Sequence, residues 1–227
     1  MQPNPKTLAG SEYPDTCYAY HAILTESAAE AAQVFQDIIA ADALVSLDEL
    51  QITSEHTYPT DIVAGDTGYV FLSLGKPTDI RQDQGYIFVF DPKQLVEFGA
   101  IVGMMDLDPA YRRLALDAGE KLWEDEYEHW DFEFHDPDRV RTTFTQLQAA
   151  TRLSGHAALR WIDWVCGDGP EPADLITKAL EFTNRYQLFG PPGNPYVAQS
   201  MTEILFPKKL PLGLLVGTVE DHQFSWR

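Results

Sequence analysis

The amino-acid sequence predicts an α+β fold in one domain, and two observations carry this prediction. Segments rich in aromatic and β-branched residues gather toward the two ends of the chain, whereas helical patterns fill the middle. Because strands and helices do not alternate as regular βαβ units, a doubly wound parallel sheet is not expected. The chain has 227 residues, 44% of them hydrophobic, which is enough to bury a full core.

The first expected elements are an arm and a strand. Residues 1–16 carry three prolines and are expected to form an extended N-terminal arm, which leaves 17–227 as a single domain. Tyr18 and Tyr20 alternate with smaller residues across 17–24, a pattern typical of a β-strand.

Helix starts are marked by capping residues. Ser27 and Glu30 match the S-x-x-E capping box, and the helix that they begin is expected to end near Asp42. An Asp followed by Pro, which supplies an N-cap and a first helical residue, begins two further helices. The expected helices cover 27–42, a short stretch after Asp91, 109–127, 137–165 with a break near 154–155, and 172–185. A loop is expected at 190–195, and strands are expected at 17–24, 50–53, 68–74, 85–91, 202–206 and 214–219.

The charge of the chain limits its partners. Lys and Arg number 16 and Asp and Glu number 35, so the formal net charge is −19. This charge repels polyphosphates at long range and argues against non-specific binding of nucleic acids. The acidic residues concentrate in 120–138, whereas 139–162 holds no Asp or Glu. An anionic macromolecular acceptor could bind this second stretch, although a solvated helix face is the plainer interpretation; its basic residues are Arg139, Arg141, Arg152 and Arg160.

No segment directs the chain to a membrane or to export. The first residues lack a basic region followed by an apolar run, and no later run approaches the ~20 apolar residues that cross a bilayer. A cytoplasmic location is therefore expected, with no membrane partner. Cys17 and Cys166 lie far apart and lack CxxC spacing, so two reduced, packed thiols are expected rather than a disulfide or a zinc site.

The leading candidate for catalysis is Glu203. It lies in a strand-like run, 202–206, that has large apolar side chains on both faces. A strand of this kind is usually interior, and an ionised carboxylate there is costly unless it is paired or lies in a cleft. The alternative is an exposed strand end at which Glu203 pairs with Lys208 or Lys209, and composition alone favours that alternative.

Other polar residues are less distinctive. His21 lies in an apolar-aromatic strand, where a core histidine is the plainer interpretation, and the Ser73 hydroxyl can line a site or merely bond the backbone. An extended 129–135 segment would place four potential metal ligands on one face, but nothing elsewhere completes a coordination shell, and no metal is expected. Those four residues are His129, Asp131, Glu133 and His135. The glycine loops of dinucleotide-binding and P-loop proteins and the G-x-S-x-G elbow are absent from the sequence.

Three separated segments resemble the ADP-ribosyltransferase superfamily. Tyr20-His21, in an early strand followed by a helix, resembles the first NAD-binding element of that superfamily. The Y-x-F-L-S run from Tyr69 to Ser73 is similar to the second element, and E-I-L-F-P-K-K-L-P from Glu203 is similar to the final catalytic strand. The order His, Tyr, Glu resembles the His-Tyr-Glu branch, and the bacterial toxins that modify DNA bases are similar in size and in the last strand.

This resemblance implies a split antiparallel β-sheet core with flanking helices, which holds NAD as a substrate between its halves. His21 would bond the ribose next to the nicotinamide, Tyr69 would stack against the nicotinamide, and Ser73 would belong to the same NAD-binding region. Glu203 would bond a ribose hydroxyl. Cleavage of the nicotinamide–ribose bond develops an oxocarbenium-like cation, which a carboxylate stabilises, and the same Glu can orient or deprotonate the nucleophile.

The function that the resemblance implies is mono-ADP-ribosylation of a nucleic acid or protein by a toxin or defence effector, which an inhibitor or antitoxin can accompany. The arginine-modifying branch has a Glu two positions before the catalytic Glu, and because Met201 stands there an arginine acceptor is disfavoured. Two alternatives stay open. One is an acidic, non-enzymatic binding or immunity-type protein that neutralises a basic partner through 120–138, and the other is a metal-dependent hydrolase built on His129 and His135.

Overall fold

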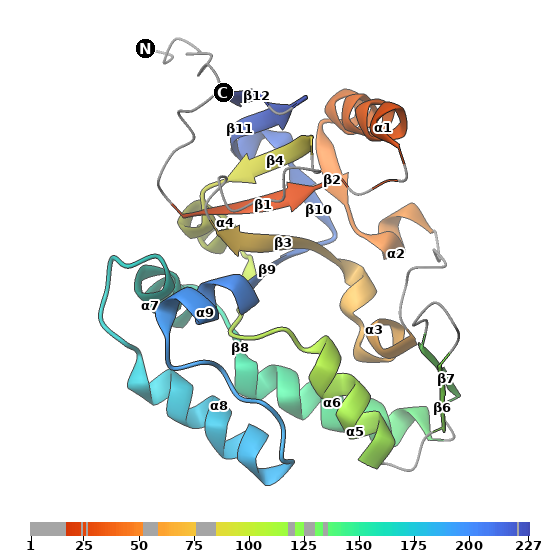
Figure 1. Ribbon diagram of the computed structural model, residues 1–227, viewed down its shortest axis with the longest axis vertical. Coiled ribbons are helices and arrows are strands. Elements are labelled where there is room, and N and C mark those ends of the chain that lie inside the picture. Colours follow the sequence, from red (N-terminus) through yellow and green to blue (C-terminus); the bar gives the residue numbers. More distant parts are fainter. Residues whose placement is uncertain are drawn as a thin grey trace.

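The structure of the protein is a computed structural model (Figure 1). It describes residues 17–23, 25, 27–51, 59–75, 85–117, 121–124, 130–133, 136–221 and 223–227. The expected N-terminal arm, 1–16, lies outside these residues. In the described part of the chain, no helix combines the length and the apolar character that a membrane span requires.

A mixed α+β architecture is built on an antiparallel sheet. Eight strands of the described residues pair in the order β12-β11-β4-β1-β3-β9-β5-β8, and all neighbours are antiparallel. Two short ribbons accompany this sheet, β2 with β10 and β6 with β7. The strands are β1 (Tyr18–Ala22), β2 (Ala43–Val45), β3 (Tyr69–Gly75), β4 (Tyr86–Phe90), β5 (Ile101–Gly103), β6 (Lys121–Glu124), β7 (Trp130–Glu133), β8 (Arg152–Leu153), β9 (Glu203–Pro207), β10 (Lys209–Pro211), β11 (Leu215–Glu220) and β12 (Gln223–Trp226).

Helices flank the sheet and extend the molecule beyond it. Figure 1 shows α1 beside the upper strands, α7 and α9 beside β9, and α5, α6 and α8 grouped in the lower half. The helices are α1 (Ala28–Ala41), α2 (Leu47–Leu50), α3 (Pro59–Ala64), α4 (Pro92–Glu97), α5 (Asp108–Asp117), α6 (Pro137–Thr151), α7 (Gly155–Val165), α8 (Ala173–Arg185) and α9 (Pro195–Met201), with 3-10 turns η1 (Asp66–Gly68) and η3 (Leu212–Leu214).

Hydrophobic cores lie on the sheet and among the lower helices. Buried and exposed side chains alternate along most of β3, as expected for a strand with one covered face. On the covered face, Phe35 of α1 stacks on Phe88 of β4 with ring centroids 4.7 Å apart. A second core joins α5, α6 and α8, where the rings of Tyr111 and Phe144 lie 4.3 Å apart. The sheet and the lower helices thus have separate hydrophobic cores.

The predicted helix starts are confirmed. Ser27 Oγ accepts a hydrogen bond from the backbone N of Glu30 at 3.2 Å, and α1 is C-capped by Asp42, whose φ of 54° is left-handed. Asp91 caps α4 and Asp136 caps α6, each followed by the proline that the sequence places there. The antiparallel sheet with flanking helices is likewise as expected.

Several predicted elements were wrong in type or extent. Leu50, expected to begin a strand, ends α2, and 52–53 lie outside the described residues. Helix α5 ends at Asp117, short of residue 127, and 121–124 pair as β6 with β7. The expected break after α6 contains a two-residue strand, β8. Only its pairing with β5 defines this strand. Such short segments have no hydrophobic period of their own.

The expectation of two separate thiols was wrong, because Cys17 and Cys166 form a disulfide. Cys17 precedes β1 and Cys166 is the C-cap of α7, and their Cα atoms lie 5.5 Å apart, a usual disulfide span. Gln199 Nε2 also donates a hydrogen bond to Cys17 Sγ at 3.3 Å. The two cysteines are 149 residues apart in sequence, so only the tertiary fold brings them together.

Candidate active site

A cavity lies where the central sheet divides between β1 and β3. These strands are paired only as far as Tyr20, whereas β1 stays paired with β4 to Ala22 and β3 stays paired with β9 to Tyr69. The cavity beside this division has a volume of about 240 Å³. Its lining residues are Tyr20, His21, Ala22, Phe71, Leu72, Ser73 and Glu203.

Three of the four sequence-predicted site residues meet in this cavity. His21 comes from β1, Ser73 from β3 and Glu203 from β9, although most of the chain separates the first from the last. Tyr69 is not among the lining residues; it begins β3 opposite Pro207, two residues before Phe71 and on the same face of the strand as Phe71 and Ser73. The structure therefore brings together the His, Ser and Glu candidates in the cavity, and Tyr69 lies beside it without lining it.

Glu203 begins an interior strand. Strand β9 lies between β3 and β5, and Glu203 is opposite Ser73 on one side and Gly103 on the other. Its side chain is half-buried, and Lys208 instead forms an ion pair with Glu49 at 3.8 Å. The alternative of an exposed strand end paired with a lysine is therefore contradicted.

A buried threonine anchors the start of β9. Thr202 Oγ1 accepts a hydrogen bond from Trp161 Nε1 at 3.0 Å and donates one to the carbonyl of Ala198 at 2.7 Å. Ile204 is buried in the main core beneath the sheet. Because successive side chains of a strand point to opposite faces, this anchoring directs Glu203 away from the core and toward the cavity.

His21 is held by the backbone of the strand across the division. Its Nδ1 lies 2.9 Å from the carbonyl oxygen of Phe71. Burial lowers the pKa of His21, and the bond to Phe71 opposes that effect only in part. A neutral imidazole is therefore favoured, and because a carbonyl only accepts, Nδ1 carries the hydrogen. Nε2 is left as a hydrogen-bond acceptor, suited to a hydroxyl group.

The ionisation of Glu203 is strongly perturbed. Burial, reinforced by Asp106, Asp66 and Asp61, raises the pKa of Glu203 to about 8, and Arg152 opposes the increase. The free protein therefore holds this side chain mostly as a neutral carboxylic acid at pH 7. A cationic group in the cavity would favour the carboxylate and lower the same pKa.

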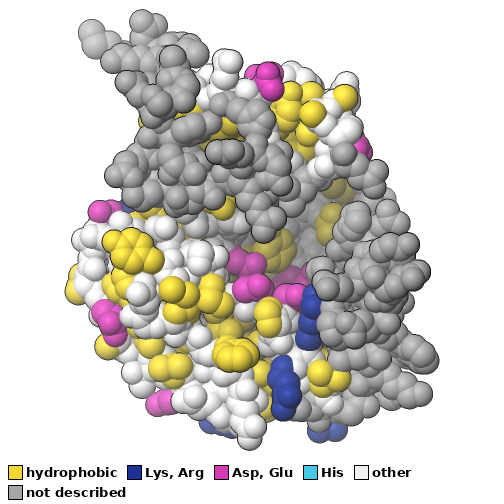
Figure 2. Space-filling model, viewed as in Figure 1, with side chains coloured by type: hydrophobic (Ala, Val, Ile, Leu, Met, Phe, Trp, Pro, Cys, Tyr) yellow, Lys and Arg dark blue, Asp and Glu magenta, His cyan; other side chains and the backbone are white. Residues whose placement is uncertain are grey.

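Asp61, Asp66 and Asp106 act electrostatically on Glu203, and Asp108 acts together with Asp66 and Asp106 on Asp61. We call Asp61, Asp66, Asp106 and Asp108 the acidic cluster. Burial raises the pKa of Asp61 to about 7, the other three carboxylates add to that increase, and Arg112 opposes it. Figure 2 shows acidic side chains gathered in the hollow at the centre of one face, next to basic ones. Within the cluster, Asp66 pairs with Arg152 and Asp108 pairs with Arg112, each at 2.7 Å, so arginines compensate part of the negative charge.

A buried polar network borders the acidic cluster. Arg152 Nη2 lies 2.7 Å from Asp66 Oδ2, and their side chains are 9% and 3% exposed. Tyr111 donates a hydrogen bond to the same carboxylate oxygen at 3.0 Å, and Gln148 Nε2 donates to the other at 3.2 Å. We call Asp66, Tyr111, Gln148 and Arg152 the Asp66 network. No sequence pattern predicts this network, and its only local signal is the spacing of Gln148 and Arg152, which lie four residues apart.

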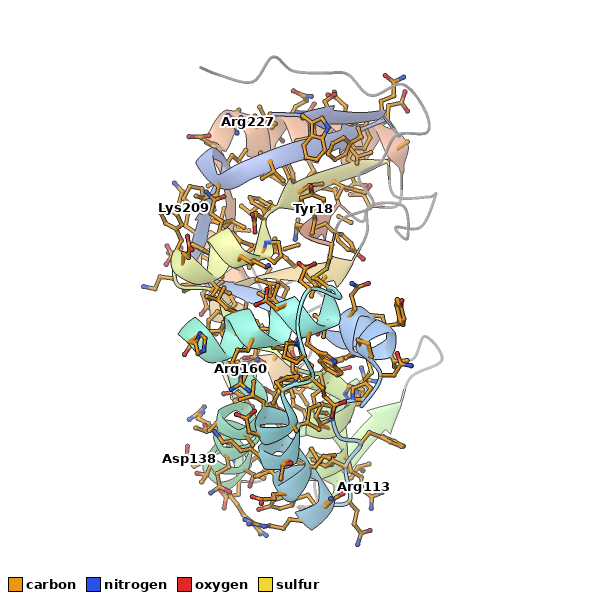
Figure 3. All side chains as sticks on the ribbon, turned by 90° about the vertical axis from the view of Figure 1, so that its left-hand side faces the viewer. Tyr18, Arg113, Asp138, Arg160, Lys209 and Arg227 are labelled. Atoms are coloured by element: carbon orange, nitrogen blue, oxygen red, sulfur yellow. A yellow bond between two sulfur atoms is a disulfide. The ribbon has the colours of Figure 1, made fainter. Side chains whose placement is uncertain are left out.

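The arginine-bearing stretch does not form one exposed face. Arg139 and Arg141 are exposed at the start of α6, but Arg152 is buried in the Asp66 network. Arg160 pairs with Asp174 of α8 through two hydrogen bonds, one of them 2.9 Å long, and Figure 3 shows it on α7, above the start of α6. Arg141 donates hydrogen bonds to Asp138 Oδ1 at 3.1 Å and to the carbonyl of Val63 at 3.3 Å, and Arg139 and Arg141 are the exposed pair among the four arginines.

The predicted metal segment is only partly within the described residues. His129 and His135 lie outside them. In the described part of the chain, no three His, Cys, Asp or Glu side chains are arranged to hold a metal ion.

Together, the cavity groups are suited to bind a sugar and to stabilise positive charge near it. His21 supplies an acceptor, Ser73 supplies a hydroxyl, and Glu203 supplies a carboxyl group that can gain or lose a proton near neutral pH.

Compared with known proteins, the sequence matches no family model, no curated protein and no solved structure.

Proposed function

We propose that the protein is an NAD-consuming mono-ADP-ribosyltransferase that modifies a macromolecular acceptor, as a toxin or defence effector would. The observation that carries the proposal is that His21, Ser73 and Glu203 line one cavity, from three strands that are neighbours in the sheet. The resemblance in sequence relates these same residues to NAD binding and catalysis. An ADP-ribosyltransferase-like core, with β1, β3 and β9 as its site-bearing strands, is part of the proposal.

The size of the cavity suits one end of NAD. Pockets that enclose a whole small molecule usually measure about 300–1,000 Å³. At about 240 Å³, this cavity would take the nicotinamide and its ribose, and the adenylate half would extend outside it. The positive charge of the nicotinamide ring would also lower the pKa of Glu203 and restore its carboxylate.

The proposed reaction assigns one task to each group. The bond between the ribose C1′ and the nicotinamide nitrogen breaks, and its electron pair leaves with neutral nicotinamide. Glu203, as a carboxylate, stabilises the oxocarbenium-like ribose, and His21 Nε2 accepts a hydrogen bond from a ribose hydroxyl. The acceptor then forms a bond to C1′ and loses its proton to Glu203 or to water. Ser73, opposite Glu203, would hold the same ribose. Tyr69, on the same face of β3 as Ser73, remains a predicted stacking residue.

The acceptor and the compartment are also part of the proposal. Met201 disfavours an arginine acceptor, and Arg139 and Arg141 are the exposed basic residues for contact with an anionic one. A cognate inhibitor and a cytoplasmic location follow from the same resemblance and composition. The Cys17–Cys166 disulfide is a reason to test the location directly, because disulfides persist mainly in oxidising compartments.

A transfer assay with matched variants tests the proposal. Purified protein is incubated with NAD labelled in the adenylate and with cell extract, DNA or RNA, and both nicotinamide release and label transfer are measured. We expect Glu203→Gln to lower the rate by about 100-fold or more, because it removes the stabilising charge. Glu181→Gln, at an exposed position on α8, serves as the control and should leave the rate unchanged.

Two outcomes would contradict different parts of the proposal. Wild-type protein that neither binds NAD nor releases nicotinamide would contradict the activity. Transfer that survives Glu203→Gln would contradict the site while keeping the activity. The acidic binding protein, the alternative from another class, instead predicts capture of a basic partner through 120–138 with Glu203 dispensable.

A further inference from the structure

Arg152 and Glu203 lie in one row across the sheet, with a glycine between them. Strand β8 pairs with β5 so that Arg152 is opposite Gly103, and Gly103 is in turn opposite Glu203. Two interstrand spacings separate the charged residues, roughly 10 Å between their Cα atoms. Gly103 contributes no side chain between them, and a Cβ atom there would contact Glu203 Cβ at 3.7 Å.

The guanidinium of Arg152 is fixed in place, but not all of its hydrogen-bond donors have a partner in the described part of the chain. Asp66 binds one terminal nitrogen, and Asp66 is itself held by Tyr111 and Gln148. The guanidinium carbon lies 5.8 Å from the centre of the Tyr69 ring, over its face. Among the described residues, Arg152 Nε is buried without a hydrogen-bond partner. The network thus holds a positive charge in a dry position, where its field reaches further than in water.

We propose that Arg152 is a positioning residue of the cavity, which, held by the Asp66 network, keeps the Glu203 side chain able to ionise. The effect of Arg152 on catalysis rests on the proposed function, but its effect on the ionisation of Glu203 does not. Arg152 opposes the burial and the negative charges that raise the pKa of Glu203. The charged groups that act on Glu203 are Arg152 from β8, Asp106 after β5, Asp66 from η1 and Asp61 from α3, with neutral His21 facing the cavity from β1.

Thermodynamic linkage can report the ionisation of Glu203 without any enzymatic activity. The free energy of unfolding is measured from pH 5 to 10 for each protein with and without Glu203→Gln, and the pH dependence of the difference gives the Glu203 midpoint. Arg152→Gln is expected to raise that midpoint by about 1 pH unit, because it removes the opposing positive charge. Asp66→Asn is expected to lower it, because it removes a negative charge that acts on Glu203, while the amide oxygen of the asparagine can still accept the hydrogen bond from Arg152 and hold the guanidinium.

Two further variants complete the comparison. Arg152→Lys keeps the charge and should give a midpoint between those of the wild type and Arg152→Gln. Arg185→Gln, at an exposed position at the end of α8, should not move it. The opposite directions expected for Arg152→Gln and Asp66→Asn separate an electrostatic role from a loss of packing, which would not produce them. Midpoints that are unchanged, or that move in the same direction, would overturn the proposal. If Arg152→Gln does not fold, the Asp66→Asn variant still tests the proposal, because an unchanged or raised Glu203 midpoint in that variant would overturn it.

Nicotinamide release by the same variants separates this inference from the proposed function. In Arg152→Gln, kcat/KM at pH 7 should fall about tenfold and the pH profile should move to higher pH with the Glu203 midpoint. Shifted midpoints in proteins that never cleave NAD would leave the electrostatic role intact and contradict the enzymatic one. Cleavage of NAD by proteins whose Glu203 midpoints do not shift would support the enzymatic activity and contradict the electrostatic role of Arg152.

Discussion

The Glu203 side chain must meet two opposing conditions. Its burial favours the neutral acid, whereas stabilisation of an oxocarbenium-like cation requires the carboxylate. Because its pKa is raised from 4.5 to about 8, Glu203 favours the folded state fully below pH 4.5, and this contribution is lost as the pH rises through about 8. The site is thus least favourable to folding at the pH where the proposed chemistry would be fastest.

The activity is expected to follow the same ionisation. The kcat/KM for nicotinamide release should rise about tenfold per pH unit from pH 6 to 7 and level off above about 8, since the free protein must lose the Glu203 proton. Initial rates at low NAD from pH 5.5 to 9.5 measure this, with circular dichroism at each pH as the control for folding. A flat profile across that range would show that Glu203 ionisation does not limit the reaction.

The sequence predicts only part of the site at this scale. His21, Ser73 and Glu203 each lie in a strand whose composition marks it, so their elements could be placed, and a resemblance supplied their order. Arg152 and Asp66 could not be found, because their ion pair joins a two-residue strand to a short 3-10 turn that lies 86 residues away. Their partnership depends on tertiary packing alone.

Among the elements, β1 carries His21 and is secured at its start by the Cys17–Cys166 disulfide to α7. This bridge closes a long loop, so its loss should mainly increase the entropy of the unfolded chain. The disulfide also lines a cavity of about 510 Å³ with Asp91 and Gln199, through which a small thiol can reach it.

Loss of the disulfide should therefore be measurable. We expect the paired substitution Cys17→Ser and Cys166→Ser to lower the free energy of unfolding by about 2–4 kcal/mol. Urea denaturation with and without dithiothreitol measures it, and reductant should destabilise the wild type by a similar amount while leaving the serine variant unaffected. Equal stability of the wild type with and without reductant would show that the bridge does not constrain the chain.

Elements with a local signature were predictable and very short ones were not. The caps at Ser27, Asp91 and Asp136 act on their own helices, so the sequence contains the whole interaction. The strands β2, β5, β8 and β10 have two or three residues each, too few for an alternating pattern, and their pairing partners define them.

The whole molecule carries a formal net charge of −19. Self-repulsion of this kind destabilises the compact state, and dissolved salt weakens it. Between about 10 mM and about 100 mM salt, the screening length falls from about 30 Å to about 10 Å.

Stability should consequently increase with salt. We expect the Tm at pH 8 to rise by about 2–4 °C over that range of NaCl, corresponding to about 1 kcal/mol. Differential scanning fluorimetry measures it, and the same series at pH 4, where many carboxylates are protonated, should give a smaller increase. A Tm that stays constant or falls at pH 8 would indicate that the acidic groups are already compensated.

The place of β9 in the sheet has a consequence for how the protein is made. This strand lies between β3 and β5, yet the ribosome adds its first residue, Glu203, only after both neighbours and all the α-helices of the described residues. During translation, β4, β1 and β3 on one side and β5 and β8 on the other are made before β9, and the edges of β3 and β5 that pair with it stay open until it is added. The proposed catalytic carboxylate arrives with the strand that joins them, so a nascent chain shorter than about 203 residues has neither a closed sheet nor a complete site.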